Sequence, residues 1–266
     1  MQEDPSPSPP EYFMGREVDT YYVLKAVLTK RLVSVIGEPG IGRSSLVCAL
    51  CHYINERAST MHGIDRIYFV RANRNKRNPL RSLVQRFLKK LIEEEKARPF
   101  DTDAEMETMF DAICRFLKLE KVLVVFDHCE LIIDADEANE FPLLLSKLCR
   151  ETKNVKVLLT NRRDLGIPSL GEHPISLGPL KYADTVRLFA NLCPYLHTPA
   201  DRKKLFETLV KDNEVAEVLS TDPGIAESST KRIFTILGDG IPSRIEKAAY
   251  DLTKEDFLSL YKLQVS

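Results

Sequence analysis

The sequence almost lacks net charge, because 38 lysine and arginine residues are matched by 39 aspartate and glutamate residues in a chain of 266. A protein without a global positive field has no general attraction to nucleic acid or to an anionic membrane. Long apolar runs are lacking too: none approaches the roughly 20 residues that span a bilayer, and the N-terminus has no apolar signal stretch. We therefore expect a cytoplasmic protein that has no membrane contact and for which nucleic acid is an unfavoured partner.

The six cysteines lack the regular spacing of a disulfide-stapled scaffold, which favours a reducing interior. Cys48 and Cys51 have the spacing of two zinc ligands, but no second pair follows, and a structural zinc site needs four ligands. Core thiols are the favoured interpretation of this pair. The chain also has no internal repeat, so a solenoid is not supported.

The order of apolar and amphipathic stretches indicates two folded parts after a short tail. Residues 1–11 hold proline and serine with little apolar content, which predicts a disordered tail. From residue 12, short β-branched runs alternate with amphipathic stretches, as in a parallel sheet covered by helices. Beyond Leu177 only helical patterns remain, so we expect an α/β domain over residues 12–178 and an all-helical domain over residues 179–266. The five expected strands are Leu32–Ile36, Ile67–Val70, Val122–Phe126, Val155–Leu159 and Ile175–Leu177.

The strongest motif is the glycine-rich segment from Gly37 to Ser44, which follows an expected strand and precedes an expected helix. In that context glycines let the backbone wrap around a phosphate, and the amides at the helix start donate hydrogen bonds to it. Ser44 is placed to bind Mg²⁺, whereas Arg43 stands where such loops have lysine, and the exchange is not conservative. The alternative is a plain glycine turn. The residues expected to hold phosphate are Gly37, Gly40, Ile41, Gly42, Arg43, Ser44 and Ser45.

A second signal is the apolar run that ends in Asp127, since such a strand delivers a carboxylate to the edge where ligands of α/β folds collect. Asp127 would then hold Mg²⁺ directly or through water, although a turn-initiating aspartate is the commoner explanation for one strand alone. His128 stands where a water-activating acid is expected, and the next acid is Glu130.

A third apolar run ends in Thr160, Asn161 and Arg162. In one common sheet order this strand lies between the other two, so Thr160 or Arg162 would face the terminal phosphate. Arg163 is expected to be a solvated charge.

The basic residues from Arg71 to Arg81 have no interleaved aromatic side chains, which favours a solvated loop over nucleic-acid stacking.

These segments, taken in order, resemble the NB-ARC and NACHT-related STAND class of P-loop ATPases. The resemblance includes Phe13-Met14-Gly15-Arg16-Glu17 before the first strand, Leu177-Gly178-Pro179-Leu180, and Gly238-Asp239-Gly240-Ile241-Pro242. It implies a P-loop NTPase fold with a C-terminal all-helical lid. It also implies that Pro242 abuts the adenine, and we expect Gly15 and Arg16 on the other side of the base.

The resemblance implies a switch that exchanges ADP for ATP, with Mg²⁺ as cofactor and other protein domains or further copies of the chain as partners on activation. Asp127, Glu130 and Arg162 are the catalytic candidates. Because Arg43 and His128 depart from the pattern, we expect slow or absent hydrolysis. Two alternatives stay open: a pseudo-ATPase scaffold for protein contacts, and an AAA+-like ATPase.

Overall fold

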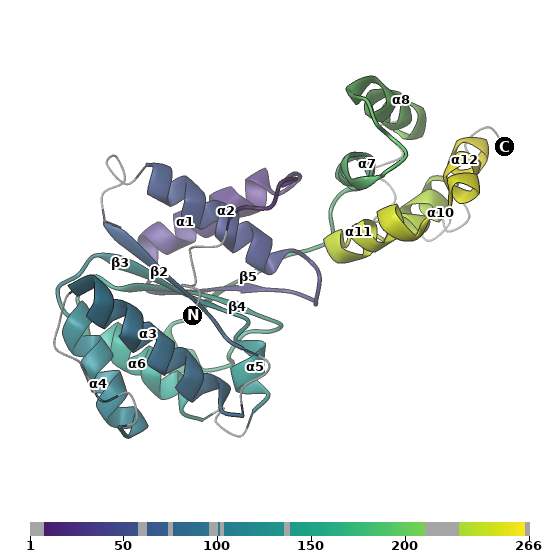
Figure 1. Ribbon diagram of the computed structural model, residues 1–266. Helices are drawn as coiled ribbons and strands as arrows, with labels where there is room; N and C mark the ends of the chain where they lie inside the picture. The colour runs from purple at the N-terminus through teal and green to yellow at the C-terminus, as the bar shows by residue number, and fades with distance from the viewer. Residues whose placement is uncertain are drawn as a thin grey trace. The chain divides into compact units, whose positions relative to one another are not determined.

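The computed structural model describes residues 8–57, 63–73, 77–95, 101, 104–135, 139–210 and 229–263. A sheet of five parallel strands in the order β2-β3-β4-β1-β5 forms the centre of the α/β part (Figure 1). This confirms the predicted parallel sheet and the place of the Thr160 strand between those of the phosphate loop and Asp127. The strands are β1 (Leu32–Ile36), β2 (Arg66–Arg71), β3 (Val122–Asp127), β4 (Lys156–Asn161) and β5 (His173–Ser176).

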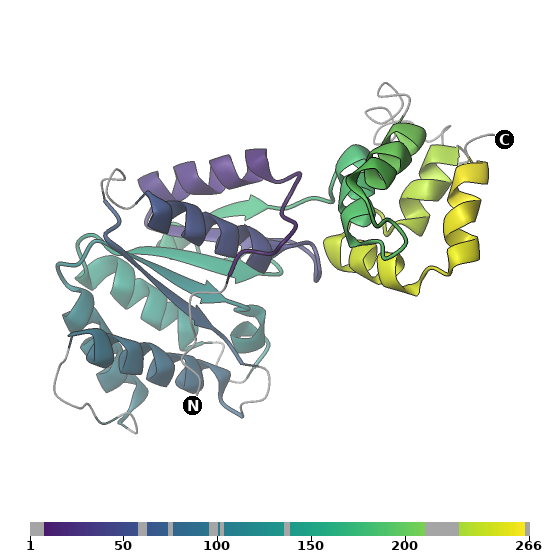
Figure 2. The ribbon, with the colours of Figure 1, turned by 45° about the horizontal axis from the view of Figure 1, so that its top comes forward.

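Helices cover both faces of this sheet. Figures 1 and 2 show α1 and α2 on one face and α3, α4 and α6 on the other. The helices of this part are α1 (Glu17–Thr29), α2 (Arg43–Glu56), α3 (Pro79–Glu95), α4 (Met106–Leu117), the short α5 (Glu130–Ile133) and α6 (Phe141–Glu151), with a 3₁₀ turn at Pro168–Leu170. This arrangement explains the sequence of β3, in which all residues are buried, since a parallel sheet covered on both faces needs continuous apolar strands.

Aromatic side chains tie the sheet to the helices on the α3 side. Tyr68 contacts Phe87, Phe87 contacts Phe126, and Phe126 contacts Phe141, with ring centroids 5.6, 5.8 and 6.0 Å apart. Three of the four rings are fully buried, and each such side chain contributes about 1.5–3 kcal/mol of hydrophobic stabilisation. This core fixes β3, and therefore the position of Asp127 at its end.

The opposite face of the sheet holds the cysteine pair of α2. Cys48 and Cys51 are buried free thiols, with 5% and 3% of their surface exposed, which confirms that they are core residues. Burial raises the pKa of Cys48 to about 11 and that of Cys51 to about 12, so both stay protonated at neutral pH.

The residues described after β5 form helices and no strand, in agreement with the predicted helical part. These helices are α7 (Tyr182–Leu192), α8 (Pro199–Leu209), α10 (Ser229–Ile236), α11 (Pro242–Asp251) and α12 (Lys254–Leu263). They enclose a core of their own, in which Val186, Phe189 and Leu237 are fully buried. Gly240 joins α11 to the segment before α7: its carbonyl accepts from the Leu180 amide at 2.7 Å, and a side chain at Gly240 would overlap Leu180.

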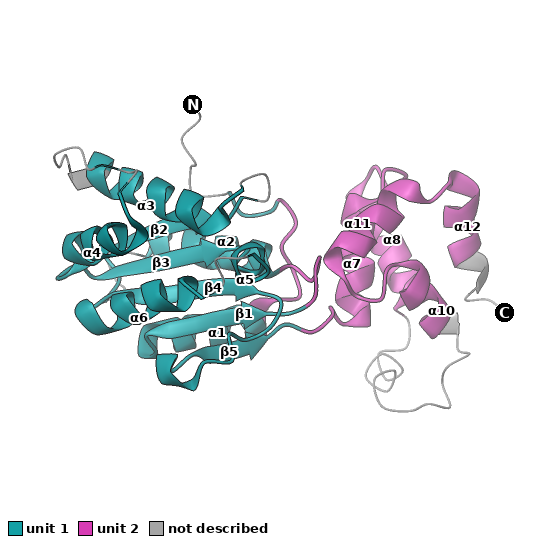
Figure 3. Ribbon diagram, turned by 90° about the horizontal axis from the view of Figure 1, so that it is seen from below, with its two compact units in different colours: residues 1–10, 19–37, 43–177 teal, residues 11–18, 38–42, 178–266 magenta. Residues whose placement is uncertain are grey.

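The chain divides into two compact units (Figure 3). The sheet unit contains residues 19–37 and 43–177, and the helical unit contains residues 11–18, 38–42 and 178–266. The tip of the glycine-rich loop thus groups with the helical unit. In the described part of the chain, no helix is long and apolar enough to cross a membrane.

Candidate functional site

The glycine-rich loop connects β1 to α2, as the sequence predicts. Gly40 and Gly42 have φ angles of +83° and +97°, a region that side chains other than glycine rarely adopt. Helix α2 begins at Arg43, and the amides of its first turn have no intrahelical acceptor. Such amides, with the positive end of the helix dipole behind them, suit a phosphate group. Ser44 and Ser45 are the second and third residues of the helix and are partly buried.

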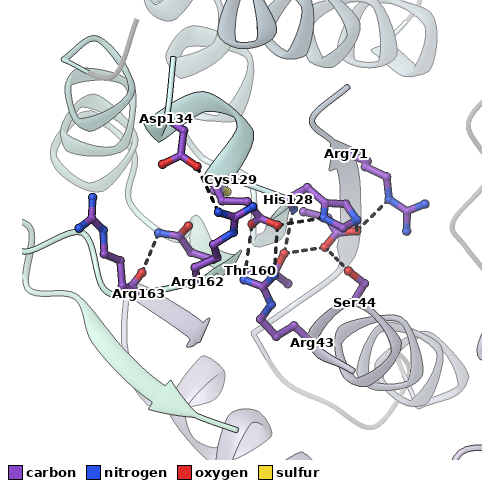
Figure 4. Close-up of polar contacts among 12 residues, drawn as sticks. Arg43, Ser44, Arg71, His128, Cys129, Asp134, Thr160, Arg162 and Arg163 are labelled. Carbon is purple, nitrogen blue, oxygen red and sulfur yellow. Dashed lines mark hydrogen bonds and ion pairs between the residues drawn. The ribbon is translucent and has the colours of Figure 1, made fainter. Parts of the chain in front are cut away.

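Ser44, Asp127 and Thr160 meet at the carboxyl edge of the sheet. Figure 4 shows Ser44 and Thr160 among the polar side chains around them. The Ser44 hydroxyl donates to Asp127 Oδ1 at 2.8 Å, and the Thr160 hydroxyl donates to the same oxygen at 2.6 Å. Thr160 Oγ1 in turn accepts from the His128 amide at 2.8 Å. Asp127 and Thr160 are buried, so their strand ends hold these groups in one arrangement. Three residues chosen from separate motifs are therefore direct neighbours.

Arg43 and Glu130 form a buried ion pair beside this group. Nη2 of Arg43 lies 3.1 Å from Oε1 of Glu130, and Nη1 lies 3.5 Å from Oε2. The two side chains are 7% and 8% exposed. The loop residue that replaces lysine thus directs its charge to a carboxylate of the chain itself.

Arg71 is a member of this site that the sequence did not indicate. As the last residue of β2 it stands opposite Asp127 in the β2–β3 register, and its Nε donates to Asp127 Oδ2 at 2.8 Å. The expected role as a solvated charge was therefore wrong for Arg71. A signal was present: a cation ends one strand where an acid ends another, and neighbouring parallel strands bring their ends together.

His128 lies between the two carboxylates. It adopts φ +63°, which is uncommon for a residue other than glycine. Its Nδ1 is 3.3 Å from Glu130 Oε1, and its Nε2 is 3.8 Å from Asp127 Oδ2. The hydrogen bond to Glu130 raises the pKa of His128 against the opposing effect of burial. Burial raises the pKa of Glu130, but the bond from His128, its own backbone amide and the charge of Arg43 together lower it.

Arg162, predicted to act on the phosphate, is not joined to this cluster. Its Nη1 forms an ion pair with Asp134 Oδ2 at 3.6 Å, and 47% of its side chain is exposed. Within the described residues, no hydrogen bond or ion pair links Arg162 to Asp127 or Ser44. Its role as a catalytic group stays a prediction.

The tip of the loop, in the helical unit, contacts residues that the sequence predicted for the adenine site. Arg16 is buried and donates from Nη2 to the Ile41 carbonyl at 2.9 Å. The Gly40 carbonyl accepts from the Ser243 amide at 3.2 Å, at the start of α11. A Cβ added to Gly42 would lie 3.6 Å from Pro242 Cγ. The loop tip, Arg16 and Pro242 are thus neighbours.

Gly15 belongs to the same neighbourhood as Arg16. An added Cβ there would lie 2.7 Å from Cβ of Asp184 on α7, and φ is +69°, so the position requires glycine. Gly37, at the end of β1, completes the predicted set at the other end of the loop.

The backbone at the start of α2 suits an anion better than a divalent cation, because the amides of a first helical turn have no intrahelical acceptor. Ser44 and Asp127 have the hydroxyl and carboxylate oxygens that Mg²⁺ uses. However, the second oxygen of Asp127 is bound by the guanidinium of Arg71, a permanent positive charge. As arranged, Asp127 does not fit Mg²⁺.

Residues 6–178 match the family model described as novel STAND NTPase 1. No match was found among curated proteins. Among solved structures, a Walker-type ATPase of Pyrococcus abyssi is similar with a TM-score of 0.53 and 16% identity, over 97% of this chain and 73% of that one. A chain of Drosophila ORC, whose structure was determined bound to DNA, has a TM-score of 0.50 and 13% identity, over 93% and 67%.

A signal-transduction ATPase with numerous domains and a tetratricopeptide-repeat sensor, from Pyrococcus horikoshii, has a TM-score of 0.49 and 16% identity. The similarity covers 97% of this chain but 33% of that protein, so this chain spans about a third of it. The structures from Pyrococcus abyssi and Drosophila, at 16% and 13% identity, show a shared fold.

Proposed function

Because the chain belongs to the novel STAND NTPase 1 family, we propose that it binds ADP or ATP at the Gly37–Ser44 loop and acts as a nucleotide-dependent switch domain. The observation that carries the proposal is the loop itself: two positive-φ glycines lead into the first turn of α2, next to the hydroxyls of Ser44 and Thr160. The amides would hold the phosphates, and Ser44 would donate a further hydrogen bond.

Adenine is the proposed base because the sequence resembles the NB-ARC and NACHT class, in which a proline abuts it. Pro242, Arg16 and Gly15 are the residues proposed to enclose it, and their proximity to the loop tip supports the choice. A proline ring offers a flat apolar surface without a competing donor. The switch role rests on the two-unit organisation, since a ligand can bias two states only through different contacts in each.

The proposal includes slow or absent hydrolysis. Arg43 is paired with Glu130, so neither residue is available in this arrangement, the first to neutralise charge on a phosphoryl group and the second to orient water. The same pair favours the alternative of a pseudo-ATPase scaffold that keeps the fold for protein contacts. An AAA+-like ATPase is the other alternative, and a rise in assembly mass with ATP would favour it.

The test is to denature purified protein, chromatograph any nucleotide released, and measure ADP and ATP affinity by calorimetry. The variant Gly42→Asp adds a negative charge inside the loop and should weaken binding at least about tenfold. Gly166→Asp is the matched control, since Gly166 also has positive φ, at +67°, and has no atom near its Cβ position. No binding by the natural protein, or equal loss in both variants, would contradict the proposal and favour the scaffold.

A further inference from the structure

Both oxygens of Asp127 are bound by groups of the chain. Oδ1 accepts from Ser44 and Thr160, and Oδ2 accepts from Arg71 at 2.8 Å. A carboxylate has about four acceptor sites, and three are filled by these donors. The side chain of Asp127 is 0% exposed, so water does not compete for the oxygens.

The position of Arg71 follows from the fold. Arg71 is the last residue of β2 and pairs in register with Asp127 of β3. The amide of the next residue, Ala72, donates to the Asp127 carbonyl at 2.8 Å. Arg71 is therefore held beside Asp127 through its main chain as well as through its side chain. The bond uses Nε, and no hydrogen bond or ion pair in the described residues uses the two terminal nitrogens. The Arg71 side chain is 44% exposed, so an anion in solvent can reach it.

The charges of the site are already balanced without a metal. Asp127 and Glu130 supply two negative charges, and Arg43 and Arg71 supply two positive charges that persist at any physiological pH. Mg²⁺ gives up its water reluctantly and needs oxygen ligands in near-octahedral geometry, whereas the Asp127 carboxylate beside Ser44 is shared with a guanidinium. A guanidinium, in contrast, matches phosphate oxygens in charge and geometry.

We propose that Arg71 takes the place of a divalent cation at Asp127, so that this chain binds its nucleoside di- or triphosphate free of Mg²⁺. Nε neutralises Asp127, and the terminal nitrogens donate to phosphate oxygens. This inference rests on the proposed function, because it specifies the form of the nucleotide that the same loop receives.

The experiment compares ADP affinity in excess MgCl₂ and in EDTA for the natural protein, Arg71→Gln and Arg57→Gln. Arg57 is the matched control, since its side chain is 45% exposed and is paired with Glu56. The natural protein and Arg57→Gln should bind equally in both solutions, within about twofold, whereas Arg71→Gln should bind at least about tenfold more tightly with Mg²⁺. A natural protein that loses affinity about tenfold in EDTA overturns the inference.

A second measurement separates this inference from the proposed function. Mn²⁺ alone is titrated into each protein and followed by electron paramagnetic resonance, without nucleotide. Mn²⁺ binding by Arg71→Gln and not by the natural protein supports the inference. Equal Mn²⁺ affinity of the two proteins overturns it, even if neither binds nucleotide. Absence of ADP binding in both solutions counts against the proposed function instead. If Arg71→Gln does not fold, Arg71→Lys is used instead. Because lysine keeps a positive charge, this variant should still bind ADP in EDTA. A Mg²⁺ requirement for ADP binding by Arg71→Lys would overturn the inference.

Discussion

The guanidinium of Arg43 faces the carboxylate of Glu130 through two nitrogen–oxygen pairs, at 3.1 and 3.5 Å, although the residues are 87 positions apart. A lysine at position 43 would offer one ammonium and no planar fork, so it would lack this two-point contact. The pair therefore links the start of α2 to the start of α5. With arginine in place of lysine at position 43, the charge at the end of the loop is held by Glu130.

The first prediction concerns the stability of this pair. Arg43→Met removes the guanidinium that faces the buried Glu130 carboxylate and leaves His128 as its remaining partner, so it should lower the free energy of unfolding by about 3 kcal/mol. Urea denaturation followed by circular dichroism measures the change. The double variant Arg43→Met, Glu130→Leu removes both charges and should recover most of the loss. A single variant within about 0.5 kcal/mol of the natural protein would show that the pair contributes little.

The second prediction concerns pH and His128. Its pKa in the folded protein is raised above 6.5, chiefly by the bond to Glu130. The protonated form therefore stabilises the fold, fully below the unfolded pKa, and the contribution disappears as pH rises through the raised value. The lowered pKa of Glu130 acts on the acid side: its contribution is present above 4.5 and is lost as pH falls through its folded value.

Urea denaturation between pH 6 and 9 tests the contribution of protonated His128 to stability. The natural protein should lose stability on going to high pH, by less than about 1 kcal/mol, because His128 is 38% exposed and solvent screens its contacts. His128→Asn keeps a residue that tolerates positive φ and removes the charge, so its profile should be flatter. The groups facing His128 are Glu130, Asp127 and Arg71. Identical profiles would exclude His128 as the titrating group.

The third prediction concerns Pro242. Pro242→Ala removes part of an apolar surface at the proposed adenine site and should weaken ADP binding by about 1 kcal/mol. Pro199→Ala is a matched control, because both prolines stand at the first position of a helix, α11 and α8 respectively. Calorimetry should find unchanged ADP affinity for Pro199→Ala. Equal affinity for both variants would remove Pro242 from the site.

The sequence predicted the centre of the sheet better than its edge. The ends of β1 agree with the prediction at both residues, because Leu32–Ile36 is a buried apolar run between Arg31 and Gly37. The edge strand β5 runs over His173–Ser176 instead of 175–177, since its residues are mostly exposed and carry no apolar run. Helix α12 lies within the part predicted to be helical, although Phe257 and Leu260 are the buried hydrophobic residues described in it and form only a weak pattern.

The candidate site was predictable where a residue belongs to one local motif. Ser44 was found from the glycine-rich loop, and Asp127 and Thr160 were found from strand ends; parallel strand order explains why they meet. The ion-pair partners of Arg43 and Arg71 could not be predicted in the same way. Arg71 and Asp127 are 56 positions apart, and a charge in a polar stretch gives no sign of its partner until strand register is known.

The last prediction is that ATP turnover is slow while nucleotide is bound. The backbone amides of the loop depend on glycine geometry, which Arg43 leaves in place, so binding does not require the missing lysine. Turnover requires a cation on the transferred phosphoryl group and a group that orients water. In the structure, Arg43 is bound to Glu130 and His128 occupies the position after Asp127.

Phosphate release under saturating ATP should therefore stay below about 1 per second for the natural protein, the low end of ordinary enzyme rates. Arg43→Lys frees Glu130 from its two-point contact and supplies a compact ammonium, so its nucleotide affinity should rise. If affinity rises without turnover, the deficit lies at His128, and adding His128→Asp to Arg43→Lys should then increase phosphate release. Arg57→Lys, the same exchange one residue after the end of α2, is the control and should change neither quantity. Turnover of the natural protein above that limit would contradict the assignment of Arg43 and Glu130 to a structural pair.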